Sequence, residues 1–224
     1  RQTLQAIVAG DPDAVTIQIG VANSLWAEHA GKVPLILQST MTRVDDSGCE
    51  LIATPEDAVR MGADAFAVVA FVRGDSGAAD LRIVADCVRE ASRYEMPVIL
   101  HIYPRVFTDG VKVSFAAEDI AWAVRCAVEI GVDVVKTPYC GEVSAFSQIV
   151  ADCPIPLVVA GGPNTGELIK SLQMMSDVVK TGARGATIGR NVWGHEKITE
   201  VVQAFKAVIH DDVSPEQALG IVQQ

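Results

Sequence analysis

Seven short apolar segments alternate with segments of helical periodicity along almost the whole chain. The apolar segments are rich in Val, Ile, Leu and Ala, as buried parallel strands are, and span residues 14–19, 34–38, 65–71, 97–102, 133–136, 157–160 and 185–188. Helices are expected over residues 1–8, 22–29, 54–61, 77–94, 117–130, 144–151, 166–181, 197–210 and 215–222. Strict alternation of this kind predicts a parallel sheet covered by helices.

Local signals mark several of the helix ends. Thr54 is expected to cap the helix that follows it, with Pro55 in the first turn. Gly131 and Gly182 are expected to end the helices before them, and Ser214 to cap the last helix.

A (β/α)8 TIM barrel is the fold that this alternation favours. The chain begins with a helix that has no strand before it, and seven strands follow. We therefore expect one barrel domain over residues 1–224, N-terminally incomplete, with its first strand missing from this sequence. A doubly wound sheet is the alternative, although no GxGxxG motif follows a strand. The irregular segments 39–53 and 105–116 follow strands on the expected catalytic face and are candidate lids or substrate loops.

Composition excludes several classes of partner. The net charge of -10 gives no basic patch for nucleic acid, and no apolar run approaches the roughly 18 residues of a membrane span. The five cysteines are scattered, odd in number and never in CxxC spacing, which predicts a reduced, cytoplasmic protein without a zinc site. Residues 45, 46 and 50 are read as a solvated acidic loop, and Trp193 and His195 as barrel-closing or subunit-contact residues.

A lysine closes the apolar run Asp133-Val134-Val135-Lys136-Thr137-Pro138-Tyr139. In a barrel this position is the carboxyl end of a strand, where active sites are built. Burial would lower the pKa of the Lys136 amine, which could then attack a ketone and form a Schiff base. A solvated strand-end lysine is the alternative.

Glycines follow the last two predicted strands, in Ala160-Gly161-Gly162-Pro163 and Thr187-Ile188-Gly189-Arg190-Asn191. Barrels often bind phosphate at these two strand ends, because glycine lets oxygens approach the backbone closely. Arg190 could add a charged fork. We expect Gly161, Gly162, Gly189 and Arg190 to bind a substrate phosphate; plain turns are the alternative.

The segment His101-Ile102-Tyr103-Pro104-Arg105 supplies two further candidate catalytic side chains. Period-two alternation places His101 and Tyr103 on one face of their strand, and Tyr103 one strand before Lys136. A phenol near a nascent iminium can act as a general acid and base. The alternative is a tyrosine and a histidine that only fill a polar barrel interior.

Together these segments resemble the archaeal-type class I (DhnA/DeoC-LacD-like) Schiff-base aldolase family. The similarity covers nearly the whole chain and rests on GVDVVKTPYCG, YPR, VVAGGP and GARGATIGRNVW, in the family's order and spacing. It implies that Lys136 is the Schiff-base lysine and Tyr103 the proton-transferring tyrosine. It also implies that the four residues of the phosphate site bind a donor like dihydroxyacetone phosphate.

Three features depart from the family pattern. The Asp-His-Gly motif of the family's first strand, whose aspartate assists catalysis, is absent from this sequence. His101 stands where the glycolytic members often have Trp, which suggests a different acceptor. Val106 stands where a glycine is expected after the Tyr-Pro-Arg run.

The resemblance implies a class I, metal-independent aldolase or transaldolase that needs no cofactor. Its substrate would be a small phosphorylated ketose or keto compound, as for fructose-bisphosphate aldolases and 2-amino-3,7-dideoxyheptulosonate synthases. The family's habit also implies a homo-oligomer, with the decamer as precedent. Two alternatives stay open: a coenzyme A-dependent thiolase acting on a phosphorylated diketone, and a non-catalytic phosphate-binding barrel.

Overall fold

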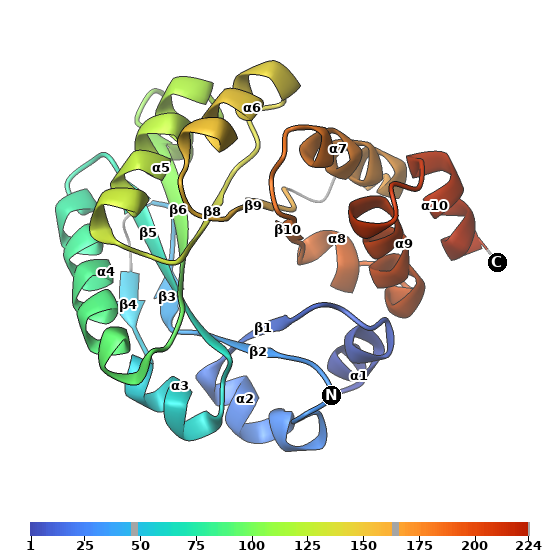
Figure 1. Ribbon diagram of the computed structural model, residues 1–224, viewed down its shortest axis with the longest axis horizontal. Coiled ribbons are helices and arrows are strands. Elements are labelled where there is room, and N and C mark those ends of the chain that lie inside the picture. The colour runs from blue at the N-terminus through green and yellow to red at the C-terminus, as the bar shows by residue number, and fades with distance from the viewer. Residues whose placement is uncertain (46–48, 163–165, 224) are drawn as a thin grey trace.

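Seven parallel strands form one curled sheet in the spatial order β1–β2–β5–β6–β8–β9–β10 (Figure 1). The computed structural model describes residues 1–45, 49–162 and 166–223. The strands are β1 (Val15–Gln18), β2 (Leu35–Gln38), β5 (Ala65–Val72), β6 (Val98–Val106), β8 (Val134–Thr137), β9 (Leu157–Ala160) and β10 (Ala186–Thr187). Each of the seven predicted strands is therefore present, and the order along the chain is the order in the sheet.

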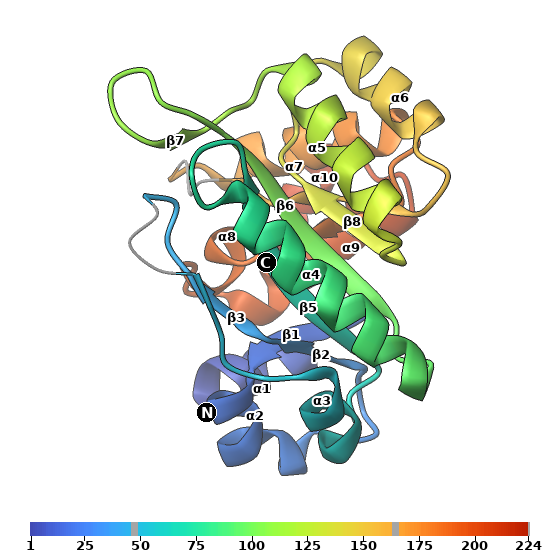
Figure 2. The same cartoon turned by 90° about the vertical axis from the view of Figure 1, so that its left-hand side faces the viewer.

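Helices surround the sheet and cover its outer face (Figures 1 and 2). They are α1 (Gln2–Ala9), α2 (Ile19–Leu25), α3 (Pro55–Met61), α4 (Gly77–Ala91), α5 (Ala117–Ile130), α6 (Val143–Asp152), α7 (Leu168–Lys180), α8 (Arg190–Trp193), α9 (Ile198–His210) and α10 (Pro215–Gln223). Two 3-10 turns, η1 (Trp26–Glu28) and η2 (Ser92–Tyr94), extend α2 and α4. Among the described helices, none is both long and apolar enough to cross a membrane.

The two ends of the sheet are β1 and β10, and no backbone pairing joins them within the described ranges. Figure 1 shows the strands following one another inside the surrounding helices, with β1 and β10 at the two ends of the series. The expectation of a further strand before α1 stays a prediction.

Side chains alternate between the two faces of the sheet, and the face toward the helices forms an aliphatic core. Leu35, Leu37, Leu100 and Val135 are fully buried there, whereas most of their strand neighbours on the inner face are partly exposed, His101 being the buried exception. The strand β5 is buried along its whole length, as expected for a strand covered on both faces. This alternation aims the inner-face residues of β6 and β8 into the barrel.

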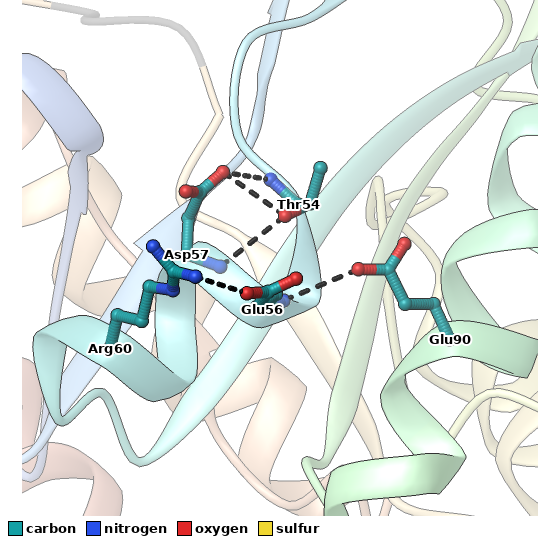
Figure 3. A network of polar contacts seen from close by, with 5 residues as sticks. All are labelled: Thr54, Glu56, Asp57, Arg60 and Glu90. Atoms are coloured by element: carbon teal, nitrogen blue, oxygen red, sulfur yellow. Dashed lines mark hydrogen bonds and ion pairs between the residues drawn. The ribbon is translucent and has the colours of Figure 1, made fainter.

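The N-terminus of α3 shows how local sequence fixes a helix end (Figure 3). The Thr54 hydroxyl accepts a hydrogen bond from the Asp57 backbone at 3.3 Å, and the Asp57 carboxylate accepts one from the Thr54 backbone at 2.8 Å. Arg60 pairs with Glu56 at 2.6 Å, and Glu90 of α4 accepts from the Glu56 backbone at 3.4 Å. The predicted cap is confirmed, and it takes the form of a reciprocal capping box.

The other predicted helix ends are also confirmed. Gly131 ends α5 in the left-handed region with φ of 91°, and Gly182 follows α7 with φ of 85°. The Ser214 hydroxyl accepts from the Gln217 backbone at 3.3 Å at the start of α10. The helix α2 begins at Ile19, directly after β1, and so starts three residues before the expected position.

Both long segments that were expected to be irregular contain antiparallel pairing. In the first, β3 (Thr40–Thr42) pairs with β4 (Cys49–Leu51). In the second, β7 (Lys112–Val113) pairs with the last two residues of β6, which therefore runs four residues beyond its predicted end at 102. Alternation of apolar residues stops near Ile102, so the apolar pattern did not reveal the prolonged strand. The pair Asp109-Gly110, with φ of 56° and 94°, marks the hairpin turn and was the signal that was overlooked.

Candidate active site

A cavity of about 410 Å³ opens at the carboxyl ends of β6, β8, β9 and β10. Its lining includes Tyr103, Lys136, Gly161, Gly162, Gly189 and Arg190, which are six of the seven residues expected to form the site. The seventh, His101, lies beside Lys136 but outside the lining. Residues from four separate sequence segments therefore meet at one cavity.

Lys136 reaches this cavity from the inner face of β8. Its backbone is in register with His101 on β6 and Val158 on β9. Burial of the side chain lowers the pKa of the amine from 10.5 to about 8, because an ammonium loses hydration there. At pH 7 about a tenth of the lysine is then uncharged and nucleophilic.

His101 lies directly next to Lys136 across the β6–β8 pair. Its side chain is only 6% exposed. Burial, and secondly the charge of Lys136, hold the pKa of the imidazole well below 6.5. His101 is therefore neutral at physiological pH and adds no positive charge that would oppose the nearby ammonium.

Tyr103 lies two residues further along β6, on the same face as His101, and β6 is the direct neighbour of β8. The predicted placement one strand from Lys136 is confirmed. Burial raises the pKa of the Tyr103 phenol to about 12, although the Arg190 guanidinium acts in the opposite direction. The phenol stays protonated at neutral pH, so it can donate a proton or a hydrogen bond.

The opposite side of the cavity is built from glycine backbone. The Gly161 N–H donates to the Thr187 carbonyl at 3.0 Å, and a Cβ at Gly161 would lie 2.9 Å from Ile188 Cα. Gly162 has φ of 72°, in the left-handed region. Gly161 therefore lets the ends of β9 and β10 approach, while Gly162 turns the chain away from the strand.

Arg190 and Asn191 tie these two glycine segments together. Arg190 Nη2 donates to the Gly162 carbonyl at 3.4 Å, and Asn191 Nδ2 donates to the Gly161 carbonyl at 2.8 Å. At Gly189 a Cβ would overlap the ring of Trp193. Pro163, which belongs to the first glycine motif, lies outside the described residues.

Several lining residues were not expected from the sequence. Trp193, which is 56% exposed, lines the cavity rather than closing the barrel elsewhere, and Met174, Pro138 and Tyr139 also take part. Trp193 lies three residues after Arg190, at the end of the one-turn helix α8, and this turn brings its ring to the cavity. A helix of four residues is too short to show a helical period in the sequence, so the placement of Trp193 was not predicted.

Only one of the two candidate substrate loops lines the cavity in the part of the chain that the structure describes. Val113 and Phe115 come from segment 105–116, whereas no described residue of segment 39–53 contributes. Asp46, one of the three acidic loop residues, lies outside the described residues. Within the described ranges, no three His, Cys, Asp or Glu side chains gather as a possible metal site.

Comparison with solved structures identifies the architecture as a TIM barrel of the aldolase type. An archaeal fructose 1,6-bisphosphate aldolase superimposes with a TM-score of 0.84 at 27% identity, covering 94% of this chain and 83% of the other. A second such structure, with its catalytic lysine covalently bound to the carbinolamine intermediate, gives a TM-score of 0.83 at 27% identity, covering 92% and 82% of the two chains. The predicted barrel fold is confirmed.

Sequence comparison gives the family. The DeoC/LacD family aldolase model matches residues 1–195, and the chain therefore belongs to the DeoC/LacD family of aldolases. The 2-amino-3,7-dideoxy-D-threo-hept-6-ulosonate synthase of Halobacterium salinarum is 35% identical over 220 residues, 97% of this chain and 82% of its own. The 2-amino-4,5-dihydroxy-6-oxo-7-(phosphonooxy)heptanoate synthase of Streptomyces griseus is 31% identical over 188 residues, 83% of this chain and 67% of its own.

These findings confirm the resemblance seen in the motifs. The protein is an enzyme of a class I, Schiff-base aldolase family.

Proposed function

We propose that this protein forms or cleaves the bond between the α- and β-carbons of a monophosphorylated keto compound, through an imine on Lys136. One observation carries the proposal. The Lys136 amine, with a pKa of about 8, faces a cavity whose other side is built from glycine backbone and Arg190. A nucleophilic amine and an anion site in one cavity are what a Schiff-base enzyme with a phosphate-anchored ketone needs.

In the proposed cycle the Lys136 nitrogen attacks the ketone carbon, and the carbonyl oxygen takes a proton to give a carbinolamine. Tyr103 donates its proton as the hydroxyl group leaves as water, and an iminium forms. The bond between the α- and β-carbons of the substrate then breaks, and the iminium accepts its electron pair. At the same time the β-hydroxyl group of the substrate returns a proton to the Tyr103 oxygen. An aldehyde departs and an enamine remains, which either takes a proton or attacks a second aldehyde.

His101 is proposed to support the first step. A neutral imidazole beside Lys136 can accept a hydrogen bond from the amine or from the carbinolamine hydroxyl. Its low pKa makes it a poor proton acceptor, so we assign proton transfer to Tyr103.

Arg190 and the glycines at positions 161, 162 and 189 are proposed to hold the phosphate. Binding energy at this remote group helps to hold the reacting carbons in place over Lys136. Among the described lining residues only Lys136 and Arg190 are cationic, and Lys136 is committed to the chemistry. That leaves one cation for one phosphate, which favours a keto compound with a single phosphonooxy group, as in the name of the Streptomyces griseus synthase, over a bisphosphate.

Other expectations from the sequence stand as proposals of the same kind. One continuous sheet supports a single domain over residues 1–224. Among the described residues Cys87, Cys126, Cys140 and Cys153 are free thiols, which supports a reduced, cytoplasmic setting. We also propose that the reaction needs no metal or cofactor, so activity should persist in EDTA. We propose a homo-oligomeric assembly as well, for which light scattering should give a mass of several chains.

Borohydride trapping tests the proposed function. The protein is incubated with dihydroxyacetone phosphate and borohydride, and peptide mass spectrometry locates the reduced adduct. We expect an adduct on Lys136, and none on the Lys136→Met variant or on exposed Lys180. Phosphate binding without an adduct would instead support the non-catalytic barrel, and turnover that requires coenzyme A would support the thiolase alternative.

A further inference from the structure

The largest fully buried side chain outside the proposed chemistry is an arginine. Arg105 lies at the end of β6, two residues after Tyr103, and its residue is 0% exposed. A buried guanidinium is retained only where the surrounding groups satisfy it, because its desolvation is expensive. The groups around Arg105 therefore indicate what the charge holds in place.

Arg105 binds the turn that connects β5 to α4. Its Nη2 donates to the Arg73 carbonyl at 2.7 Å and to the Ser76 hydroxyl at 2.9 Å. Arg73 has φ of 71° and Gly74 has φ of 79°, so this turn contains two successive left-handed residues. Such a conformation is unfavourable for a residue with a side chain and persists where neighbours fix it.

The same arginine contacts the aromatic ring that supports Tyr103. The Arg105 guanidinium lies 5.6 Å from the centre of the Phe71 ring, within the range of a cation–π contact. The Phe71 ring lies 5.7 Å from the Tyr103 ring, and the two residues are paired across β5 and β6. Phe71 therefore connects the buried charge to the proposed proton-transfer tyrosine.

Arg105 also fixes the hairpin that supplies one wall of the cavity. Its backbone pairs with Val113 of β7, and its guanidinium lies 5.6 Å from the ring of Phe107 in the loop between them. Figure 2 shows this hairpin extending from the end of β6, near the start of α4. Val113, which pairs with Arg105, and Phe115, two residues further along the chain, line the cavity.

A second set of polar contacts closes the same network. The Arg73 side chain pairs with Asp119 of α5 at 2.5 Å and lies 5.5 Å from the Trp122 ring. Asp119 also accepts from the Ser114 hydroxyl at 2.5 Å, next to Phe115. The β5–α4 turn, the β6–β7 hairpin and the start of α5 are thus connected around Arg105.

We propose that Arg105 is the positioning residue for this site: through Phe71 and the β7 hairpin it holds Tyr103 and the Val113–Phe115 wall against Lys136. This inference rests on the proposed function for its kinetic consequence, although not for its structural one. Arg105 is not among the described residues that line the cavity. Its removal should therefore affect the Tyr103-dependent step and leave phosphate binding intact.

Kinetics with four proteins test the inference: the unchanged protein, Arg105→Met, Tyr103→Phe and the double variant. We expect Arg105→Met to lower kcat by about 10- to 100-fold, with KM for the phosphorylated ketone within about twofold. In the double variant the arginine change should lower kcat by less than about threefold, because its target is already absent. Independent, multiplying losses, or an unchanged kcat in Arg105→Met, would overturn the proposal.

Controls separate positioning from folding. Arg125→Met removes an exposed guanidinium that pairs with Glu129 at 2.8 Å, and should leave kcat within about twofold. If Arg105→Met does not fold, Phe71→Leu removes the connecting ring while keeping an apolar side chain. When Phe71→Leu is combined with Tyr103→Phe, kcat should be little lower than in Tyr103→Phe alone. If the two losses of kcat multiply instead, the proposal is contradicted.

An NMR measurement is independent of activity. The protein contains three tyrosines, so ¹³C-labelled tyrosine gives few signals, and Tyr103→Phe assigns the relevant one. We expect the Tyr103 ring signal to move in Arg105→Met and to stay in Arg125→Met. An unmoved signal overturns the positioning role even if the protein is active, whereas a moved signal without any Lys136 adduct supports the positioning role and contradicts the proposed function alone.

Discussion

The two sides of the cavity differ in composition: one consists of ionisable side chains and the other mainly of glycine backbone. The β6–β8 side presents the ionisable side chains Lys136 and Tyr103, with His101 buried beside Lys136, and burial has shifted the pKa values of all three. The β9–β10 side presents glycines and one guanidinium, with its geometry set by backbone turns and by contacts such as that of Gly161 with Ile188. In the proposed function, one side carries out the proton and bond chemistry and the other holds an anion.

The difference affects stability as well as function. On the β6–β8 side the fold keeps an amine in a place where its charged form is disfavoured, so the chemistry carries a cost in folding free energy. On the β9–β10 side the cost is conformational, because glycines lose more backbone freedom on folding than other residues. Substitutions on the two sides should therefore fail in different ways.

The largest effect is expected for Lys136→Met. Turnover and borohydride trapping should fall by at least about 1,000-fold, because the nucleophile is gone. The fold should instead become more stable at pH 7, by about 3 kcal/mol, since the native pKa of about 8 lies below the ordinary 10.5. The unfolded chain binds the proton more tightly, so the gain is full below pH 8 and vanishes as the pH rises toward 10.5. Urea titrations at pH 7 and pH 10 check this, and equal stability at pH 7 would contradict it.

Tyr103→Phe should lower kcat by about 100- to 10,000-fold, because it removes only the proton that moves in the dehydration and cleavage steps. KM for the phosphorylated ketone should change by less than about threefold, since the phosphate is held on the opposite side. Steady-state kinetics provide both values. A rise in KM with unchanged kcat would place Tyr103 among the binding groups.

Arg190→Met tests the β9–β10 side and should give the opposite pattern. KM for the phosphorylated ketone should rise by about 10- to 100-fold, as expected when a charge-assisted hydrogen bond worth about 1.5–3 kcal/mol is lost. The kcat at saturation should change little. A matched assay with a ketone that lacks the phosphate should show no difference between Arg190→Met and the unchanged protein.

The sequence predicted which candidate site residues meet at the cavity better than it predicted the residues that surround them. Lys136, Tyr103 and the two glycine motifs follow short strands, and parallel strands bring their carboxyl ends together whatever the details of packing. Their meeting at one cavity was therefore predictable from the order of strands alone.

The supporting residues depended on information that one sequence does not display. The burial of Arg105 depends on Phe71, Arg73 and Phe107, which come from another strand and from two loops. An arginine in a loop reads as a surface residue, and the left-handed turn at Arg73 follows no recognisable turn motif. The β7 hairpin does carry a signal, because Asp109-Gly110, with φ of 56° and 94°, is a pair typical of tight hairpin turns, and it was overlooked. Trp193 was likewise placed by the single turn of α8, which is too short for a periodic pattern.

The pH dependence of imine formation offers a smaller but diagnostic effect. Because only the uncharged amine attacks, the rate of trapping by Lys136 should rise about tenfold between pH 7 and pH 9 and level off above the pKa of about 8. His101 stays neutral over this range, and Tyr103 stays protonated below its pKa of about 12. If the rate of trapping continues to rise up to pH 10.5, the Lys136 amine is not desolvated. The β6–β8 side would then not favour the uncharged amine, and the difference between the two sides would be smaller than we infer.

The smallest effect is expected far from both sides of the cavity. Thr54→Ala removes one half of the capping box of α3, where the hydroxyl accepts from the Asp57 backbone (Figure 3). The free energy of unfolding should fall by about 1 kcal/mol, measured by urea titration, while kcat and KM stay unchanged. Thr54→Ser keeps the acceptor and should restore most of that loss, since serine caps as well as threonine does. If Thr54→Ala altered kcat instead, the geometry of the cavity would depend on a distant helix end as well as on the strands that carry its lining. Activity could then not be explained by the chemical side and the binding side of the cavity alone.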